Sequence, residues 1–130
     1  IVEKASGQVF GSISIFNAAL GDAGQKAFWP ELDPSGGIWE AGYCIGRSWW
    51  NRGLATEALK AVTAYWFSHT DGDWLTCCHA KANPASGRVM EKAGFVYHHD
   101  AVEHKFDGTP VECKSYLLTR ERYEHRKDLP

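Results

Sequence analysis

The loop Trp50–Thr56 combines residue types that can hold a phosphate or pyrophosphate group. It joins a predicted strand, Ile38–Gly46, to a predicted helix, Leu54–Ser68. The first N–H groups of a helix lack backbone partners, and the helix dipole places partial positive charge at the same end. Gly53 lets the backbone approach a ligand closely. The loop therefore predicts an anion-binding cradle, with an ordinary strand-to-helix turn as the alternative.

A second segment, Asn83–Phe95 (NPASGRVMEKAGF), follows after one predicted helix and one predicted strand. Asn83 and Ser86 around Pro84 suit a turn and a helix N-cap, and Gly94 suits a left-handed helix end. The same Asn and Ser side chains offer hydrogen-bonding groups to a ligand, and the two roles are compatible. The two segments together, in this order and at this spacing, are a more specific signal than either segment alone.

Together, Trp50–Ala58 (WNRGLATEA) and Asn83–Phe95 resemble the GNAT superfamily of acyl-CoA-dependent N-acetyltransferases. They are most similar to its ribosomal-protein, or Rim-type, branch, which tolerates Trp at position 50 where many other members have Gln or Arg. The resemblance covers most of the chain, from the first hairpin to the C-terminal YLLTRERY. Relative to the family, the chain is expected to lack an N-terminal strand and one or two helices that help to form the acceptor side.

The resemblance implies acetyl-CoA as the co-substrate and no metal. The loop would cradle the CoA pyrophosphate, with Arg52 adding charge near a phosphate. The backbone of Cys44–Arg47 would carry the pantetheine arm where the central strand parts from its neighbour. The resemblance also places Asn83 against the arm and Ser86 near the sulfur. The implied cofactor-binding residues are Cys44, Ile45, Gly46, Trp50, Asn51, Arg52, Gly53, Leu54, Ala55, Thr56, Asn83 and Ser86.

Glu40 and Ser86 are the catalytic residues that the resemblance implies. Glu40 shares a strand face with Gly42 and Cys44 and would act as general base on the acceptor amine; a solvated carboxylate at a strand end is the alternative. Many superfamily members use a tyrosine, four residues beyond the Ser86 position, as acid for the departing thiolate. Here that position holds Met90. Ser86 is the replacement candidate, although a thiol of pKa about 8.5 is a fair leaving group without an acid.

Composition and charge exclude other classes of protein. The 14 Lys and Arg residues against 16 Asp and Glu give a formal net charge of −2, which argues against nucleic-acid binding. No apolar run approaches membrane-spanning length, and no signal peptide is visible. Neither a Walker loop nor a Rossmann triple glycine is present, and the histidines lack metal-site spacing. Adjacent Cys77 and Cys78 would face opposite sides of a strand, so we expect reduced thiols and a cytoplasmic protein.

The predicted fold is a single α/β domain over residues 1–130. Its sheet is mixed and mostly antiparallel, has a central parallel pair, and is flanked by helices. Helical spacing predicts that Ala55, Leu59, Val62 and Trp66 face the sheet. The predicted strands are Ile1–Ala5, Val9–Phe16, Ile38–Gly46, Trp74–Ala80, Phe95–Phe106 and Val111–Leu118; a second helix is Ser86–Ala93.

The remaining segments carry weaker signals. Asn17–Gly37 is predicted to be a long loop, which in a compact domain is usually functional or mobile. Glu121–Lys127 is predicted to be a polar, frayed tail. His98 and His99 are interpreted as a solvated hairpin edge, with the acceptor mouth as the alternative.

The predicted function is acetyl transfer from acetyl-CoA to a primary amine by direct attack in a ternary complex. The acceptor is either a protein N-terminal α-amine or a small-molecule amine. A non-catalytic CoA-binding module of the same fold is one alternative. An interaction domain, with a homodimer as one assembly and Trp29, Trp49 and Trp50 as exposed contacts, is another.

Overall fold

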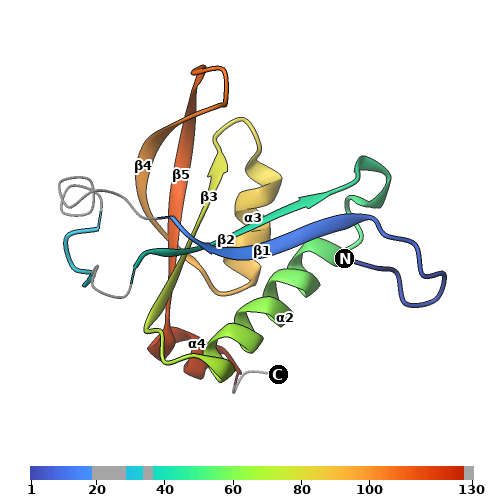
Figure 1. The fold of residues 1–130 in the computed structure, drawn as a ribbon, viewed down its shortest axis with the longest axis horizontal. Helices are drawn as coiled ribbons and strands as arrows, with labels where there is room; N and C mark the ends of the chain where they lie inside the picture. Colours follow the sequence, from blue (N-terminus) through green and yellow to red (C-terminus); the bar gives the residue numbers. More distant parts are fainter. Residues whose placement is uncertain (19–28, 34–36, 128–130) are drawn as a thin grey trace.

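In the computed structural model, residues 1–18, 29–33 and 37–127 are described. They form a five-stranded sheet with strand order β1-β2-β3-β5-β4. Figure 1 shows the sheet with helices α2, α3 and α4 packed against it. The strands are β1 (Gly11–Asn17), β2 (Trp39–Ile45), β3 (Trp74–Ala80), β4 (Val96–His104) and β5 (Pro110–Thr119). The helices are η2 (Arg47–Trp49, 3-10), α2 (Leu54–His69), α3 (Pro84–Lys92) and α4 (Arg120–Lys127).

The sheet is mixed, as the sequence predicts. β1 pairs with β2, β3 with β5, and β4 with β5, and all three pairs are antiparallel. β2 and β3 are parallel and are joined by the pair Glu40 and Thr76. Parallel neighbours require a crossover, and α2 provides it. The fold is therefore the predicted α/β arrangement with a central parallel pair.

The buried face of helix α2 is rotated about the helix axis relative to the face that the sequence predicts. Leu59, Thr63 and Phe67 are its buried residues. Two members of the predicted stripe, Val62 and Trp66, are only partly buried against the core. The buried stripe is shifted because α4 covers α2 on a second side.

The prediction of a frayed tail over Glu121–Lys127 is wrong, because Arg120–Lys127 forms helix α4. Tyr123 is 5% exposed, and its ring stacks on Phe67 of α2 with centroids 4.7 Å apart. The apolar stripe of α4 is a single aromatic residue among charged ones, so its sequence periodicity carries little signal. Tertiary packing, rather than local propensity, stabilises this helix.

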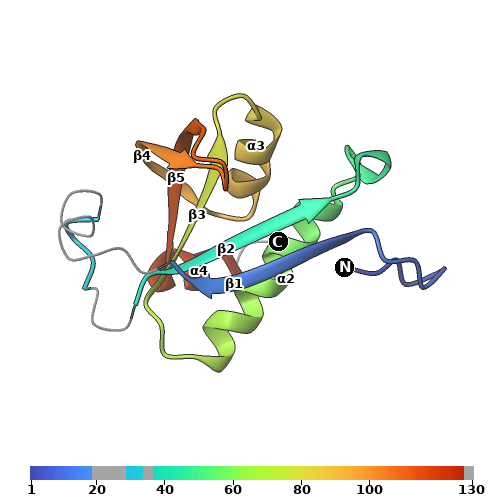
Figure 2. The same ribbon diagram turned by 45° about the horizontal axis from the view of Figure 1, so that its top comes forward.

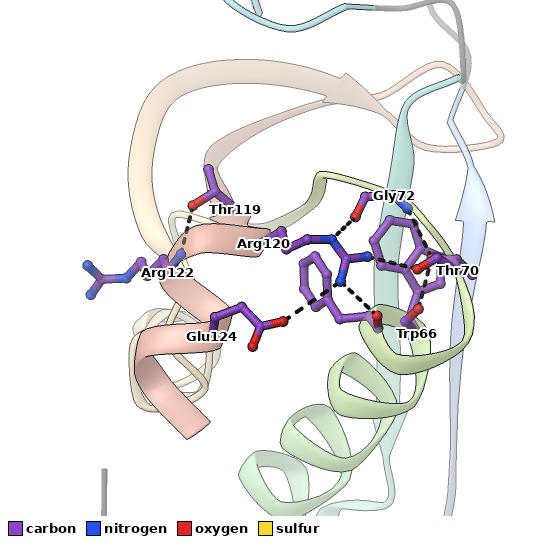
Figure 3. A network of polar contacts seen from close by, with 8 residues as sticks. Trp66, Thr70, Gly72, Thr119, Arg120, Arg122 and Glu124 are labelled. Carbon is purple, nitrogen blue, oxygen red and sulfur yellow. Dashed lines mark hydrogen bonds and ion pairs between the residues drawn. The ribbon is translucent and has the colours of Figure 1, made fainter. Parts of the chain in front are cut away.

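Arg120 fixes the C-terminal end of α2, as Figure 3 shows. Its guanidinium donates to the carbonyl oxygens of Phe67, Thr70 and Gly72 at 2.8, 2.8 and 2.9 Å. The last carbonyls of a helix have no intrahelical partner. The Arg120 fork satisfies this end and ties α2 to the start of α4.

Helix α3 sits close to the sheet and ends as predicted. A Cβ atom on Gly87 would lie 2.7 Å from His79 Nε2 and 3.2 Å from Tyr116 Oη, so any larger residue would force the His79 ring to move. Gly94 follows the helix with φ +101, and Phe95 N–H donates to Met90 O at 3.0 Å. This is a left-handed C-terminal cap.

The N-terminal hairpin is shorter than predicted. A single bridge joins Val2 and Val9, and the regular strand begins only at Gly11. Val2 and Val9 are both more than half exposed, so this segment has little apolar contact to extend its ladder. The predicted strand Ile1–Ala5 is therefore wrong as a sheet member.

Part of the predicted loop Asn17–Gly37, residues 19–28 and 34–36, lies outside the described residues. Trp29 is 5% exposed, which corrects its assignment as an exposed contact residue. It packs against His98 and His99, with ring centroids 4.4 and 4.7 Å away. His98 Nε2 also hydrogen-bonds Glu31. The solvated-edge interpretation of the two histidines is therefore wrong.

Candidate active site

The central parallel strands part immediately after they meet. Beyond the pair Glu40 and Thr76, Cys77 Sγ donates to Ala41 O at 3.2 Å, and the backbone ladder goes no further. Figure 2 shows β2 and β3 diverging toward their carboxyl ends. Ligands of open α/β sheets bind outside the carboxyl ends of strands. The opening between β2 and β3 is therefore a candidate ligand-binding site.

A cavity of about 370 Å³ lies at this opening. It brings together the end of β2, the loop before α2 and the first turns of α3. Its size suits a small molecule or part of a cofactor. The cavity is lined by Tyr43, Cys44, Ile45, Trp50, Asn51, Gly53, Thr56, Asn83, Ala85, Ser86, Arg88, Val89 and Lys92.

The loop before α2 has the backbone conformation of an anion cradle. Asn51 and Gly53 have positive φ values of 61 and 75. The first helical hydrogen bond runs from Glu57 N–H to Gly53 O at 3.0 Å, so the N–H groups of Leu54, Ala55 and Thr56 have no partner within the helix. Consecutive N–H groups at a helix N-terminus form an anion-binding concavity.

Two aromatic contacts hold this loop in place. Trp49 stacks on Phe10 with centroids 4.4 Å apart, and Phe10 is 9% exposed. Trp50 donates its indole N–H to Ile45 O at 2.8 Å, while its side chain is 53% exposed at the cavity. Trp49 therefore anchors the loop, and Trp50 closes it onto the end of β2.

The cations on the cavity wall differ from the predicted one. The Arg52 guanidinium lies over the Trp49 ring, 4.8 Å from its centroid, and donates to Ser48 O at 3.2 Å. Arg52 does not line the cavity, whereas Arg88 and Lys92 of α3 do. The two residues are four apart, so they lie on one helix face. The positive charge at this site therefore comes from α3.

The backbone of β2 offers N–H groups to the opening. Gly46 N–H is already used, because it donates to Phe10 O at 2.9 Å on the β1 side. Successive residues of a strand direct their backbone groups to opposite edges. Ile45 and Tyr43 therefore direct their N–H groups away from β1, toward the place where β3 has parted.

Ser86 lies on the cavity wall with an unpredicted partner. Its Oγ is 2.6 Å from Tyr43 Oη, and Ser86 O, 3.2 Å from the same Tyr43 oxygen, is the alternative acceptor for the single phenol proton. Asn83 lines the same cavity as the N-cap residue of α3, but its side chain makes no capping hydrogen bond. Met90 is 1% exposed in the core, so position 90 does not reach the cavity.

Glu40 lies on the sheet face opposite Ala41 and Tyr43, because side chains alternate along a strand. Burial raises the pKa of its carboxyl to about 7, and the negative charge of Glu103 adds to the effect. A carboxyl with a pKa near neutral is suited to accept a proton at physiological pH. Glu40 does not line the cavity and sits at the base of the opening instead.

The sequence profile of a family described as an acetyltransferase (GNAT) domain matches residues 1–96. The chain belongs to the GNAT acetyltransferase family. No curated protein matches the chain by sequence.

Solved structures share the GNAT fold at low identity. The aminoglycoside acetyltransferase AAC(6')-Ib, in complex with coenzyme A and kanamycin, is 21% identical with a TM-score of 0.69 over 95% of this chain and 67% of that one. Ribosomal-protein-S5-alanine acetyltransferase from Vibrio fischeri is 15% identical, with a TM-score of 0.71 over 94% and 60%. A spermidine N-acetyltransferase mutant from Vibrio cholerae is 21% identical, with a TM-score of 0.60 over 70% and 54%. The chain thus spans about two thirds or less of these relatives.

The structure brings most of the implied GNAT cofactor residues to one cavity. Gly46, Arg52, Leu54 and Ala55 do not line it, although Leu54 and Ala55 carry two of the free helix N–H groups. Sequence reasoning missed Tyr43, Arg88 and Lys92. The i, i+4 spacing of the two cations was a usable signal. Nothing local to Tyr43 shows that it reaches α3.

Other findings concern metals, cysteines and membranes. Within residues 1–18, 29–33 and 37–127, no group of three or more His, Cys, Asp and Glu side chains is placed to hold a metal. All four cysteines are free, and only Cys44 is exposed. None of the helices in the described part of the chain has the length and apolarity to cross a membrane.

Proposed function

We propose that this chain transfers an acetyl group from acetyl-CoA to a primary amine. One observation carries the proposal: the anion cradle before α2 and the Tyr43–Ser86 wall line the same cavity, at the opening between β2 and β3. Glu40, with its raised pKa, stands at the base of that opening. Membership of the GNAT family supports the same reaction class.

The residues present fit acetyl-CoA. The free N–H groups at the start of α2 would hold the pyrophosphate, and Arg88 and Lys92 would neutralise phosphate charge. Gly53 leaves open space where a Cβ would stand, since no atom lies within 4 Å of that position. The arm would then run along the free edge of β2 toward Ser86.

The proposed transfer is a direct attack without a covalent enzyme intermediate. The amine nitrogen forms a bond to the thioester carbon, and the C–S bond breaks with its electron pair going to sulfur. Glu40 accepts the proton that the amine loses. The N–H groups of Ile45 and Tyr43, on the free edge of β2, would polarise the carbonyl.

The acceptor class follows from charge and amine basicity. A lysine-type amine of pKa about 10.4 is neutral in about 1 molecule in 2500 at pH 7, whereas an α-amine of pKa about 7.7–8.0 is neutral in roughly 1 in 10. Glu40 and Glu103 form an acidic region that favours a cation. We propose a cationic amine, with a protein N-terminal α-amine as the Rim-type candidate and a polyamine or aminoglycoside as the small-molecule candidate.

Isothermal titration of acetyl-CoA and CoA into the chain tests the cofactor site first. Micromolar binding supports the site, and absence of binding contradicts it. Thiol release is then followed with a peptide bearing N-terminal alanine, with spermidine and with kanamycin. Turnover with any of them supports the reaction. Binding without turnover would favour the non-catalytic CoA module, in line with the buried Met90 at the usual position of the acid.

A further inference from the structure

Tyr43 and Ser86 form a hydroxyl pair between β2 and α3. Their side-chain oxygens are 2.6 Å apart, which is the distance of a short O–H···O hydrogen bond. Both residues line the cavity, and Tyr43 is half-buried. Since Met90 is buried in the core, Tyr43 is the phenol that the structure places on this wall.

The proton arrangement of the pair decides what it offers to a ligand. If Tyr43 donates to Ser86 Oγ, the serine proton is free to point into the cavity. If Ser86 donates to Tyr43, the phenol proton is donated to Ser86 O, 3.2 Å away, and the pair offers the cavity no proton. A phenol is a stronger acid than an alcohol and is the better donor. Negative charge in the cavity favours the first arrangement further, because hydrogen bonds in a chain polarise one another.

We propose that Tyr43 is a positioning residue of the transfer reaction: it holds Ser86 Oγ so that the serine donates a hydrogen bond to the sulfur of the departing CoA thiolate. This inference rests on the proposed function, because it needs the sulfur of bound CoA at the Ser86 wall. The cavity supports that placement, since it runs from the anion cradle at Gly53 to Ser86. The electron pair of the broken C–S bond goes to sulfur, the serine proton stays on Ser86, and Glu40 holds the proton that the amine has lost.

The role is hydrogen bonding rather than proton transfer. Burial raises the pKa of Tyr43 to about 12. That value is far above the ~8.5 of an alkyl thiol. Tyr43 therefore keeps its proton over the whole working range, and the thiolate departs stabilised but unprotonated.

The test measures CoA binding rather than activity. The affinities of free CoA and acetyl-CoA are determined by isothermal titration at pH 7.5 and pH 9.5. Acetyl-CoA has the same phosphates and arm but no ionisable thiol, so the ratio of the two affinities isolates the sulfur. The ratio cancels only effects that act equally on both ligands. The titratable groups around the pair, which could act on the thiolate itself, are Cys44, Cys77, Cys78, His79, Arg88 and Lys92, and all of them remain in the Tyr43→Phe variant.

In the wild type, the CoA to acetyl-CoA affinity ratio should rise about tenfold from pH 7.5 to 9.5, because a hydrogen bond to a charged group is stronger than one to a neutral group. Tyr43→Phe should abolish most of that rise, as should Ser86→Ala. Tyr65→Phe is the matched control, since it removes a phenol hydroxyl from a 64% exposed residue of α2 and should keep the rise.

Each outcome separates the inference from the proposed function. A wild type that binds neither CoA nor acetyl-CoA overturns the proposed function and this inference with it. Normal binding with a flat wild-type ratio overturns the inference alone. A Tyr43→Phe variant that keeps the wild-type rise also overturns it, and shows that the hydroxyl pair only joins β2 to α3. A purely structural role would weaken both ligands equally and leave the ratio unchanged.

Discussion

Glu40 lies beside Thr76 at the one backbone ladder pair between β2 and β3 in the described part of the chain. The carboxyl therefore stands where the sheet begins to open. Packing around this point removes water from the carboxyl, and the negative charge of Glu103 acts on it as well. The carboxyl with the raised pKa therefore stands at the opening itself.

The pH dependence of turnover should follow the ionisation of Glu40. Glu40 is a base only when ionised, so kcat/KM should rise with pH up to about 7 and then level off. At pH 7.5, Glu40→Gln should lower kcat/KM by about 10²-fold, and the loss should shrink at high pH as the acceptor amine deprotonates by itself. The measurement is the wild-type to variant ratio of kcat/KM with one acceptor across pH 5.5–9.5.

Glu103→Gln provides the matched control for this profile. It removes the neighbouring charge that helps to raise the pKa of Glu40. The acidic limb should therefore move to lower pH while the plateau stays. If the wild-type profile and that of Glu40→Gln are parallel throughout, Glu40 is not the base.

The same carboxyl should reduce stability at neutral pH. Its pKa is raised to about 7 in the folded chain, against an ordinary value near 4.5, so the folded state binds more protons between these pH values. The contribution of Glu40 to stability is therefore full below pH 4.5 and is lost as pH rises through 7. Glu40→Gln should match the wild type near pH 4.5 and exceed it by about 1–3 kcal/mol at pH 8. Urea unfolding at the two pH values checks this, and an equal difference at both would contradict it.

Features with local causes could be predicted from the sequence. The turn at Gly108, with φ +85, and the cap at Gly94 both follow from residues that tolerate positive φ. The strand Trp74–Ala80 has its predicted bounds, because a short apolar run between turn signals is unambiguous here. The left-handed conformation of Gly53 before α2 belongs to the same group, whereas anion binding by this loop stays a prediction.

Features that depend on distant contacts could not be predicted. In the sequence, Tyr43 is one of several aromatic residues in predicted strands. Its hydrogen bond to Ser86 joins residues that are 43 positions apart in the chain. The helix α4 forms because Tyr123 finds Phe67 on another helix. Arg52 has the right charge at the right place in the sequence, but the nearby Trp49 ring and Ser48 carbonyl hold it off the cavity. Each of these requires the fold to be known first.

Arg120 should contribute strongly to stability and little to ligand binding. Arg120→Lys retains the charge but loses the planar fork that reaches three carbonyls. We expect a loss of about 2–4 kcal/mol in the free energy of unfolding, measured by urea denaturation. CoA affinity of the folded variant should be unchanged, because Arg120 acts at the opposite end of α2 from the cradle.

Arg52→Lys is the comparison for this change. Arg52 makes one hydrogen bond to a backbone carbonyl at an exposed site, so its replacement should cost no more than about 0.5 kcal/mol. Equal losses in the two variants would show that Arg120 does not clamp α2.

Gly53 should be needed for both backbone conformation and ligand access, and a matched pair separates the two. Gly53 and Gly108 have φ values of +75 and +85, and a Cβ at either meets no atom within 4 Å. Gly53→Ala and Gly108→Ala should therefore lose a similar free energy of unfolding, about 1 kcal/mol each. Only Gly53→Ala places its methyl group where a phosphate is proposed to bind, so only this variant should weaken CoA binding, by about tenfold or more. Gly53→Val should abolish binding, because its larger side chain fills the cradle. Unchanged CoA affinity in both Gly53 variants would remove the cradle from the cofactor site.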